Sequence, residues 1–266
     1  MNALHLGFIG TGRIARALIA GLSSREKTLL SGFDRDPATL QAIAADYPVQ
    51  PVQSVAEIAQ KAEVIILAVK PYQVAELLGE LKPLLKPEHL LISVAAGIST
   101  EFIRSRAVPA LKVIRVMPNT PAFVGEGMTA LCRGNMASDN DLTLACDLFR
   151  SIGRVAILDE SQMDAATALS GSGPAYMFYM LDALAEGGKL CGLSYDEALL
   201  LAAQTMLGAA TMALSGGKKP DELTRDVTTP GGTTEAGLNI MEAKGIRQIL
   251  VETVAAAATR SRELMK

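Results

Sequence analysis

The order of short apolar runs and helical stretches is the feature that most narrowly limits the fold of this chain. As far as Asp159 the two kinds of segment alternate, and after Asp159 no further strand-like run occurs. The run Val64–Val69 contains no polar residue, which is typical of a strand buried on both faces of a parallel sheet. The pattern therefore predicts an α/β domain with a doubly wound sheet, followed by an all-α domain.

The first half of the chain supplies the expected sheet and the helices that cover it. We expect strands at Leu4–Ile9, Leu29–Phe33, Val64–Val69, Leu90–Val94, Val113–Met117, Met128–Cys132 and Val155–Leu158. We expect helices after Gly12 and at Pro37–Asp46, Val74–Leu85, Thr100–Arg106 and Asp139–Ser151. Because strands and helices alternate, the helices should lie on both faces of a mostly parallel sheet.

The second half is rich in Ala, Leu and Met and is interrupted by Gly and Pro. The helices expected there are Pro174–Leu190, Ser194–Leu214, Pro220–Val227, Thr233–Ala243 and Gly245–Leu264. The change of pattern divides the chain into residues 1–160 and 161–266. Small apolar residues on such helices favour either a subunit interface or an ordinary bundle core, and the residues leave both interpretations open.

Charge and the length of apolar runs limit the class of partner. The 266-residue chain has 25 Lys and Arg against 28 Asp and Glu, a net charge of −3, which argues against nucleic acid and anionic membrane as partners. Its uninterrupted apolar runs are far shorter than the roughly 20 residues of a membrane-spanning helix. No Lys or Arg precedes the first glycine motif, unlike in a signal peptide. We therefore expect a cytoplasmic protein.

The scarcity of His and Cys limits the chemistry. The chain has two His and three Cys, too few for a zinc site with three His or four Cys ligands, and too few for a disulfide framework. They are His5, His89, Cys132, Cys146 and Cys191. We expect no metal site and assign neither His to a functional site, since His5 falls in the first strand and His89 just before another. The reaction should then proceed without imidazole acid–base catalysis.

A glycine-rich turn follows the first expected strand and opens the first expected helix. The segment Gly10–Ala15 reads G-T-G-R-I-A, which matches the G-x-G-x-x-G/A motif of dinucleotide-binding domains in the context that the motif requires. Gly10 permits the turn, Gly12 permits close approach of a pyrophosphate, and Ala15 lets the helix pack on the strand. A plain strand-to-helix turn is the alternative. The acidic residue Asp34 favours the dinucleotide, because it ends the second strand where a carboxylate would receive the adenosine ribose hydroxyls.

The residues around Asp34 give conflicting signals about the cofactor. Asp34 favours NADH because its carboxylate would repel a 2′-phosphate. Arg35 follows immediately, and its guanidinium could hold that phosphate; Arg13 in the glycine turn is a second candidate. Both NADPH and NADH therefore remain open.

Three more loops are expected at the edge of the sheet where ligands of open α/β folds bind. The first is Ala68-Val69-Lys70-Pro71. The second, Ser93–Ile98, contains Ala95 and Gly97, and the third is Met117–Pro121. Prolines on either side of Asn119 and Thr120 stiffen the third loop, which would help to hold an amide near a nicotinamide ring. Simple termination of the strands by proline is the alternative.

Two polar segments stand out among the helices. Ser170–Tyr176 reads S-G-S-G-P-A-Y and is expected to be a break between two helices, with Pro174 as the first residue of the second. Thr228–Thr234 reads T-T-P-G-G-T-T and runs into a helix, so free N–H groups from Gly231 to Thr234 could bind a carboxylate. The alternatives are an interhelical turn and an ordinary helix cap.

Together these motifs resemble the pyrroline-5-carboxylate reductase family along the whole chain. The motifs, in order, are the G-x-G-x-x-A turn, A-V-K-P, S-V-A-A-G-I, M-P-N-T-P, S-G-S-G-P-A-Y and T-T-P-G-G-T-T. The resemblance implies a Rossmann-type NAD(P)-binding domain in residues 1–160 and a helical substrate-binding and dimerisation domain in residues 161–266. It also implies a homodimer, sometimes assembled into a decamer, and reduction of 1-pyrroline-5-carboxylate to L-proline, the final step of proline biosynthesis.

The resemblance also implies residue roles. Thr234 matches the catalytic threonine whose hydroxyl approaches the imine nitrogen, and Thr229, Gly231, Gly232 and Thr233 match the segment that cradles the substrate carboxylate. The candidate cofactor-binding residues are Gly10, Thr11, Gly12, Arg13, Ile14, Asp34, Arg35, Ala68, Val69, Lys70, Pro71, Ala95, Gly97 and Asn119. The chain departs from the family at Arg13-Ile14, where Asn-Met is usual, and at Asp34, where an uncharged residue is common.

An imine substrate fits a chain that is poor in His. The imine nitrogen is basic enough to be protonated near neutral pH, so a hydroxyl or a water can serve where a carbonyl would need a stronger acid. A β-hydroxyacid dehydrogenase is one rival, but it needs a positioned Lys, and Asp164–Leu181 contains none. A catalytically silent NAD(P)-binding regulator is another rival, although it has no need of the Thr228–Thr234 segment.

Overall fold

The computed structural model describes residues 3–263. Two compact units form: one contains the chain through Ser172 together with the end of the last helix from Ala257, and the other contains Gly173–Ala256. Helix α12 (Ile246–Glu263) therefore belongs to both. The functional division at residue 160 stays a prediction.

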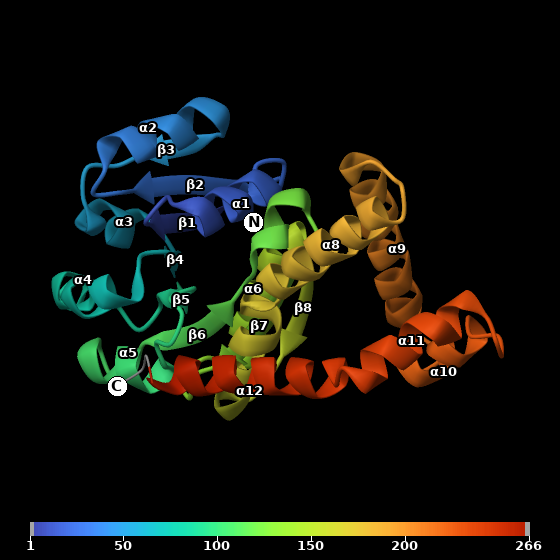
Figure 1. Ribbon diagram of the computed structural model, residues 1–266. Coiled ribbons are helices and arrows are strands. Elements are labelled where there is room, and N and C mark those ends of the chain that lie inside the picture. Colours follow the sequence, from blue (N-terminus) through green and yellow to red (C-terminus); the bar gives the residue numbers. More distant parts are fainter. Residues whose placement is uncertain (1–2, 264–266) are drawn as a thin grey trace. The chain divides into compact units, whose positions relative to one another are not determined.

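The first unit is built on one eight-stranded sheet (Figure 1). The strands are β1 Leu4–Ile9, β2 Thr28–Phe33, β3 Val49–Pro51, β4 Val64–Leu67, β5 Leu90–Ser93, β6 Lys112–Met117, β7 Gly127–Arg133 and β8 Gly153–Ile157. Their order is β3-β2-β1-β4-β5-β6-β7-β8, and β6 pairs antiparallel with β7 while the other recorded pairs are parallel. The direction of winding changes between β1 and β4, which is where ligands bind in such sheets.

The seven strands expected from the sequence are all present, with ends that differ by no more than two residues. Strand β3 and helix α3 (Val55–Lys61) were not expected. The strand is three residues long at the edge of the sheet and ends in Pro51, so it has no apolar run to detect. Helix α3 did carry a signal, because Ser54 caps it by accepting a hydrogen bond from the Glu57 N–H, in the S-x-x-E pattern.

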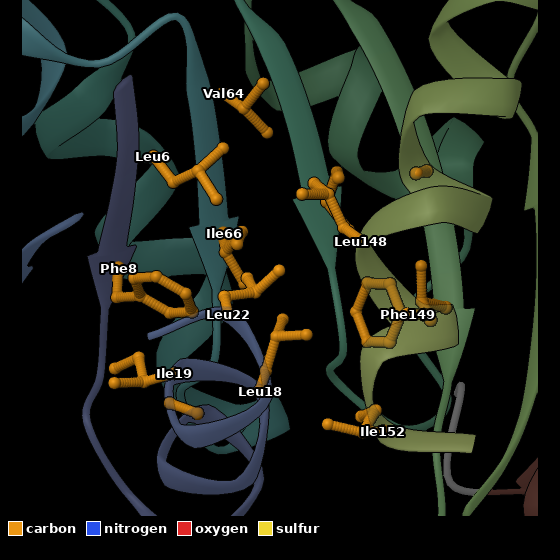
Figure 2. Packing of buried hydrophobic residues seen from close by; sticks show 14 of the residues in the cluster. Leu6, Phe8, Leu18, Ile19, Leu22, Val64, Ile66, Leu148, Phe149 and Ile152 are labelled. Carbon is orange, nitrogen blue, oxygen red and sulfur yellow. The ribbon is translucent and has the colours of Figure 1, made fainter. Parts of the chain in front are cut away.

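Helices cover both faces of the sheet. They are α1 Arg13–Leu22, α2 Pro37–Asp46, α3, α4 Val74–Leu81, α5 Thr100–Arg106 and α6 Asp139–Phe149. Helices α1, α2 and α6 share one apolar core with β1 and β4, and α3, α4 and α5 share the other. Alternate residues of β4 enter opposite cores: Ile66 faces the first and Ile65 the second. Figure 2 shows side chains of β1, β4, α1 and α6 gathered in the first core.

The segment before α8 differs from expectation. Ser170–Tyr176 was expected to contain a break between two helices, but α7 (Met163–Ala166) continues into a π-helical turn, Thr167–Gly171, and α8 (Gly173–Leu190) begins after Ser172. Pro174 is thus the second residue of α8. Small polar residues and glycines widen the helix here rather than ending it, and π-turns of this kind are frequent at functional sites.

The second unit is entirely helical. It contains α8, α9 Tyr195–Ser215, α10 Pro220–Asp226, α11 Thr233–Ala243 and most of α12. Helices α8 and α9 approach closely at Gly188, where a Cβ would lie 2.6 Å from the Cβ of Ala198. The sequence predicted these helices, although the expected end of the last one at Leu264 lies outside the described residues.

Many large apolar side chains of the second unit are exposed. Those on α9 include Leu200, Leu207 and Leu214, exposed to 70%, 57% and 61%. Among the described residues, helix α9 is long and apolar enough to cross a membrane by length and composition alone, although its uninterrupted apolar runs are short. The apolar residues of α9 are divided into short runs by polar residues such as Gln204, Thr205 and Thr211, so the length of an uninterrupted run does not reveal this helix.

Candidate functional site

Gly10 and Gly12 of the first turn occupy different surroundings, which explain in different ways why each position holds a glycine. Gly10 has φ +89°, and a Cβ there would lie 2.6 Å from the carbonyl oxygen of Ala68, so the fold itself requires glycine. At Gly12 a Cβ would meet no protein atom within 4 Å. Gly12 precedes α1 as its N-cap and has no side chain to cap the helix, so the first N–H groups of α1 receive no hydrogen bond from the N-cap residue. The turn therefore fits a dinucleotide pyrophosphate.

The carboxylate of Asp34 is fixed in place at the end of β2. Its Oδ2 accepts hydrogen bonds from the N–H of Thr11 (2.7 Å) and from the hydroxyl of Thr11 (3.0 Å). Its Oδ1 accepts a hydrogen bond from the N–H of Asp36 (3.0 Å). The glycine turn and the acidic residue are thus parts of one rigid assembly.

A cleft lies at the carboxyl ends of β1, β2 and β4. It brings together seven of the residues predicted to bind the cofactor: Gly10, Gly12, Asp34, Arg35, Ala68, Val69 and Lys70. Ile9, Phe33, Gln73 and Leu77 also line it and were not predicted. The cleft coincides with the change of winding between β1 and β4, the position expected for a dinucleotide.

Gln73 was missed although the sequence held a signal for it. Its Oε1 accepts a hydrogen bond from the N–H of Lys70 (3.0 Å), which fixes the loop after β4. Pro71 begins the short 3₁₀ helix Pro71–Gln73, with Gln73 as its third residue. Proline at the first position and Gln at the third form a capping pattern that can be recognised in a sequence.

Two further predicted residues lie in a neighbouring groove. Thr11 and Arg13 line it together with Gly12, Arg16, Thr39, Ala42 and Phe123. The guanidinium of Arg13 lies 5.5 Å from the centroid of the Phe123 ring, a cation–π contact between the glycine turn and the loop after β6. Ile14 is half-buried in α1 and lines neither space.

The remaining predicted cofactor residues lie outside this cleft. Ala95 is buried, and its N–H donates to the Ser93 hydroxyl (3.4 Å), while Gly97 has φ +75° in the following turn. Asn119 uses both ends of its amide within the chain: Nδ2 donates to the carbonyl oxygen of Ser170 (3.0 Å), and Oδ1 accepts from the N–H of Met128 (2.8 Å). Asn119 thereby ties the loop after β6 to the π-turn.

The Thr228–Thr234 segment forms a turn at the start of α11. Gly231 has φ +71°, and its N–H donates to Oε2 of Glu235 (2.7 Å). The N–H of Gly232 donates to the carbonyl oxygen of Thr229 (2.9 Å). The expectation that the N–H groups of both glycines are free was therefore wrong, because the turn and the Glu235 carboxylate use them. Thr233 and Thr234 are the first residues of α11, so their N–H groups have no helical partner.

Glu235 was not predicted, although a carboxylate in the first turn of a helix is a recognised capping signal. The cofactor cleft belongs to the first structural unit and the turn at α11 to the second.

Both histidine side chains make hydrogen-bond contacts within the first unit. Nε2 of His5 lies 3.2 Å from the Ser31 hydroxyl, and burial followed by the charge of Lys61 lowers the pKa of His5. Nδ1 of His89 accepts from the N–H of Lys86 (3.1 Å), and burial lowers the pKa of His89 as well. Within residues 3–263 no cluster of three or more His, Cys, Asp or Glu could hold a metal ion.

Comparison with known proteins shows similarity to pyrroline-5-carboxylate reductases over the full chain. A family model described as pyrroline-5-carboxylate reductase dimerisation matches residues 160–264, and one described as NADP oxidoreductase, coenzyme F420-dependent, matches residues 5–97. The pyrroline-5-carboxylate reductase of Pisum sativum is 43% identical over 270 aligned residues, covering 99% of this chain and 97% of the relative.

Solved structures of pyrroline-5-carboxylate reductases are also similar to this chain over its full length. The pyrroline-5-carboxylate reductase of Coxiella burnetii is 35% identical with a TM-score of 0.92, and all of both chains is covered. A Plasmodium falciparum pyrroline carboxylate reductase with NADP bound is 30% identical with a TM-score of 0.86, again over all of both chains.

Proposed function

This chain belongs to the pyrroline-5-carboxylate reductase family and reduces 1-pyrroline-5-carboxylate to proline with a reduced nicotinamide dinucleotide, and from that premise we propose which of its residues carry the reaction. The observation that carries the proposal is the pairing of two features: a cleft with open space at Gly12 and a threonine-rich helix start at Thr233. The first suits a dinucleotide and the second a carboxylate.

The cofactor is held by the first unit. When bound, the reduced nicotinamide supplies the hydride that the imine carbon receives. The glycine turn and the start of α1 bind the pyrophosphate, and Asp34 binds the adenosine ribose. The amide of Asn119 holds the loop after β6 in position, and it keeps its assignment as a cofactor-facing residue because the contact with Ser170 uses only one of its two Nδ2 hydrogens.

The substrate is held by the start of α11. The N–H groups of Thr233 and Thr234 lie at the positive end of the helix dipole and bind the carboxylate. Gly231 and Gly232 shape the turn, and Thr229 supports it by accepting the hydrogen bond of Gly232. The hydroxyl of Thr234 donates a hydrogen bond to the imine nitrogen, and a proton that it passes to this nitrogen is replaced on the threonine from water.

We assign cofactor binding to residues 1–160, and substrate binding and dimerisation to residues 161–266. The exposed leucines on α9 and the dimerisation family match support an assembly in which a second copy covers them. We propose a homodimer, with a decamer as the larger form, in the cytoplasm. We also propose that the protein has no nucleic-acid or membrane partner, and the net charge of −3 supports this last point because it would not attract an anionic surface.

Thr234 provides the sharpest test of these roles. Thr234→Ala should lower kcat by about tenfold to a hundredfold, because the proton donor is lost, while the affinity for the cofactor stays unchanged. Thr234→Ser, which keeps the hydroxyl, should restore most of kcat. A loss confined to KM in Thr234→Ala would contradict the donor role and leave Thr234 as a binding residue.

A further inference from the structure

The structure resolves the conflict between Asp34 and Arg35 over the two cofactors. NADPH differs from NADH by a phosphate on the adenosine ribose, which lies at the end of the second strand in this class of fold. A free cation there favours NADPH by attracting this phosphate, and Arg35 is the cation that follows β2 and lines the cleft. Whether Arg35 is free is therefore the question that decides the preference.

Two carboxylates of α4 hold Arg35. Its Nη2 lies 2.9 Å from Oε1 of Glu76 and 2.7 Å from Oε1 of Glu80, and its Nη1 lies 3.3 Å from Oε2 of Glu76. Glu76 and Glu80 are four residues apart and so lie on one face of α4. One positive charge is thus matched by two negative charges, and the guanidinium N–H groups that could donate to a phosphate already donate to carboxylate oxygens.

The neighbouring acids add to this negative field. Asp34 is held by Thr11, so its carboxylate cannot rotate away from the ribose position without breaking those hydrogen bonds. Asp36, two residues after Asp34, caps α2 by accepting from the N–H of Ala38 (3.1 Å) and adds a second negative charge after β2. Lys70 also lines the cleft, but it enters from the end of β4 and not from the end of β2, which defines the adenosine side.

We propose that this chain prefers NADH to NADPH, and that Glu76 and Glu80 determine this specificity by withdrawing Arg35 from a 2′-phosphate. The proposal rests on the assignment of this cleft to the cofactor. Asp34 supplies repulsion of the phosphate, and the two glutamates remove the compensating attraction. Neither glutamate lines the cleft, so they act through Arg35.

Binding of adenosine fragments tests the proposal without turnover. AMP and adenosine 2′,5′-bisphosphate differ only in the 2′-phosphate, and calorimetric titration gives the affinity of each. The wild-type protein should bind AMP more tightly than the bisphosphate. The double variant Glu76→Gln/Glu80→Gln frees Arg35, and we expect it to bind the bisphosphate about tenfold more tightly while its affinity for AMP stays the same.

The matched control is Glu101→Gln/Asp147→Asn. It also removes two carboxylates from exposed ion pairs with arginines, on α5 and α6, and it should leave the ratio of the two affinities unchanged. The same variants are then compared by kcat/KM with NADH and with NADPH, where the ratio should shift toward NADPH in the first variant alone.

Three results would overturn the proposal: tighter binding of the bisphosphate than of AMP by the wild-type protein, an unchanged ratio in the Glu76/Glu80 variant, or an equal change in the control. Failure of the proposed reaction is distinguishable from all three. If neither cofactor is oxidised with 1-pyrroline-5-carboxylate while the fragments bind as expected, the reaction is wrong and the specificity stands.

Discussion

At the scale of single residues, the structure separates glycines that the fold needs from a glycine that a ligand needs. Gly10 has a left-handed backbone and a carbonyl oxygen at the place of its Cβ, whereas Gly12 has ordinary φ and open space. A sequence motif gives the two residues equal weight. Only the atoms around each glycine reveal which position the fold requires and which position leaves space for a bound ligand.

This difference predicts opposite outcomes for two alanine substitutions. Gly10→Ala should destabilise the protein by about 2 kcal/mol or more, because the new Cβ meets the Ala68 carbonyl in a strained backbone. Gly12→Ala should leave stability nearly unchanged but weaken binding of the dinucleotide by about tenfold or more. Urea unfolding and cofactor titration of both variants check this. Equal loss of stability in the two variants would contradict the account.

The side chain of Asn119 marks the limit of prediction from sequence at this scale. The prolines around it indicated a stiff loop, and Pro121 does lie in a short 3₁₀ helix, Thr120–Val124. The partners of its amide, Ser170 and Met128, could not be predicted because they come from distant segments whose approach depends on the assembled sheet. The loop was therefore foreseeable, and the exact use of its amide was not.

At the scale of elements, strands with strong apolar runs could be predicted to within two residues, and elements defined by their neighbours could not. Strand β3 exists because β2 offers it an edge, and the π-turn Thr167–Gly171 depends on close packing around it. A Cβ at Gly171 would lie 2.6 Å from Cε of Met117, so a larger residue there would displace the end of this β6 side chain. No periodicity within the segment encodes that contact.

A buried ionic cluster links several elements of the first unit. Arg115 of β6 is 3% exposed, and its Nη1 lies 2.7 Å from Oε1 of Glu160. The hydroxyl of Thr100, at the start of α5, donates to Oε2 of Glu160 (2.7 Å). Asp164 of α7 accepts from the hydroxyl of Ser261 near the end of α12 (2.7 Å) and lies 3.9 Å from Nη2 of Arg115. The cluster therefore attaches the end of α12 to the sheet.

This cluster predicts a specific dependence of stability on pH. Burial would raise the pKa of Glu160, but hydrogen bonds from Thr100 and Arg115 outweigh it and hold the pKa below its usual value of 4.5. A lowered pKa means that the ionised Glu160 stabilises the fold above about pH 4.5, and that this contribution is lost as the pH falls through the lowered pKa.

Glu160→Gln should therefore lower the free energy of unfolding by about 1–2 kcal/mol near pH 7, because the buried guanidinium of Arg115 loses its closest charged partner while the 35% exposure of the Glu160 side chain lets water screen part of the loss. The difference in stability between wild type and variant should shrink below about pH 4.5. Urea unfolding across the acidic range measures it. A difference that stays constant with pH would show that Glu160 does not titrate in this way.

At the scale of the whole molecule, the second unit leaves too much apolar surface exposed for a helical bundle that stands alone. Leu200, Leu207 and Leu214 recur every seven residues, so they form a stripe along one face of α9. The sequence left open whether the Ala-rich helices form a bundle core or a subunit interface. The exposure of this stripe favours the interface, a distinction that composition does not contain.

Substitution within the stripe should change the assembly. Leu207→Glu places a charge on the face that we assign to the second copy, and we expect the dimer to dissociate at concentrations about a hundredfold higher than for the wild type. Met136→Glu, at a residue of the first unit that is 50% exposed, is the matched control and should not alter the assembly. Analytical ultracentrifugation measures both. Dissociation of the control to the same extent would argue against a specific interface on α9.

The central claim is that one chain supplies both the hydride-donor site and the imine site of a proline-forming reductase. The most direct measurement is the amount of L-proline formed per reduced nicotinamide oxidised, with purified protein, 1-pyrroline-5-carboxylate, and NADH or NADPH. The account predicts one proline for each nicotinamide oxidised, with NADH as the more efficient donor. Absence of substrate-dependent oxidation with both cofactors, or oxidation without formation of proline, would contradict it.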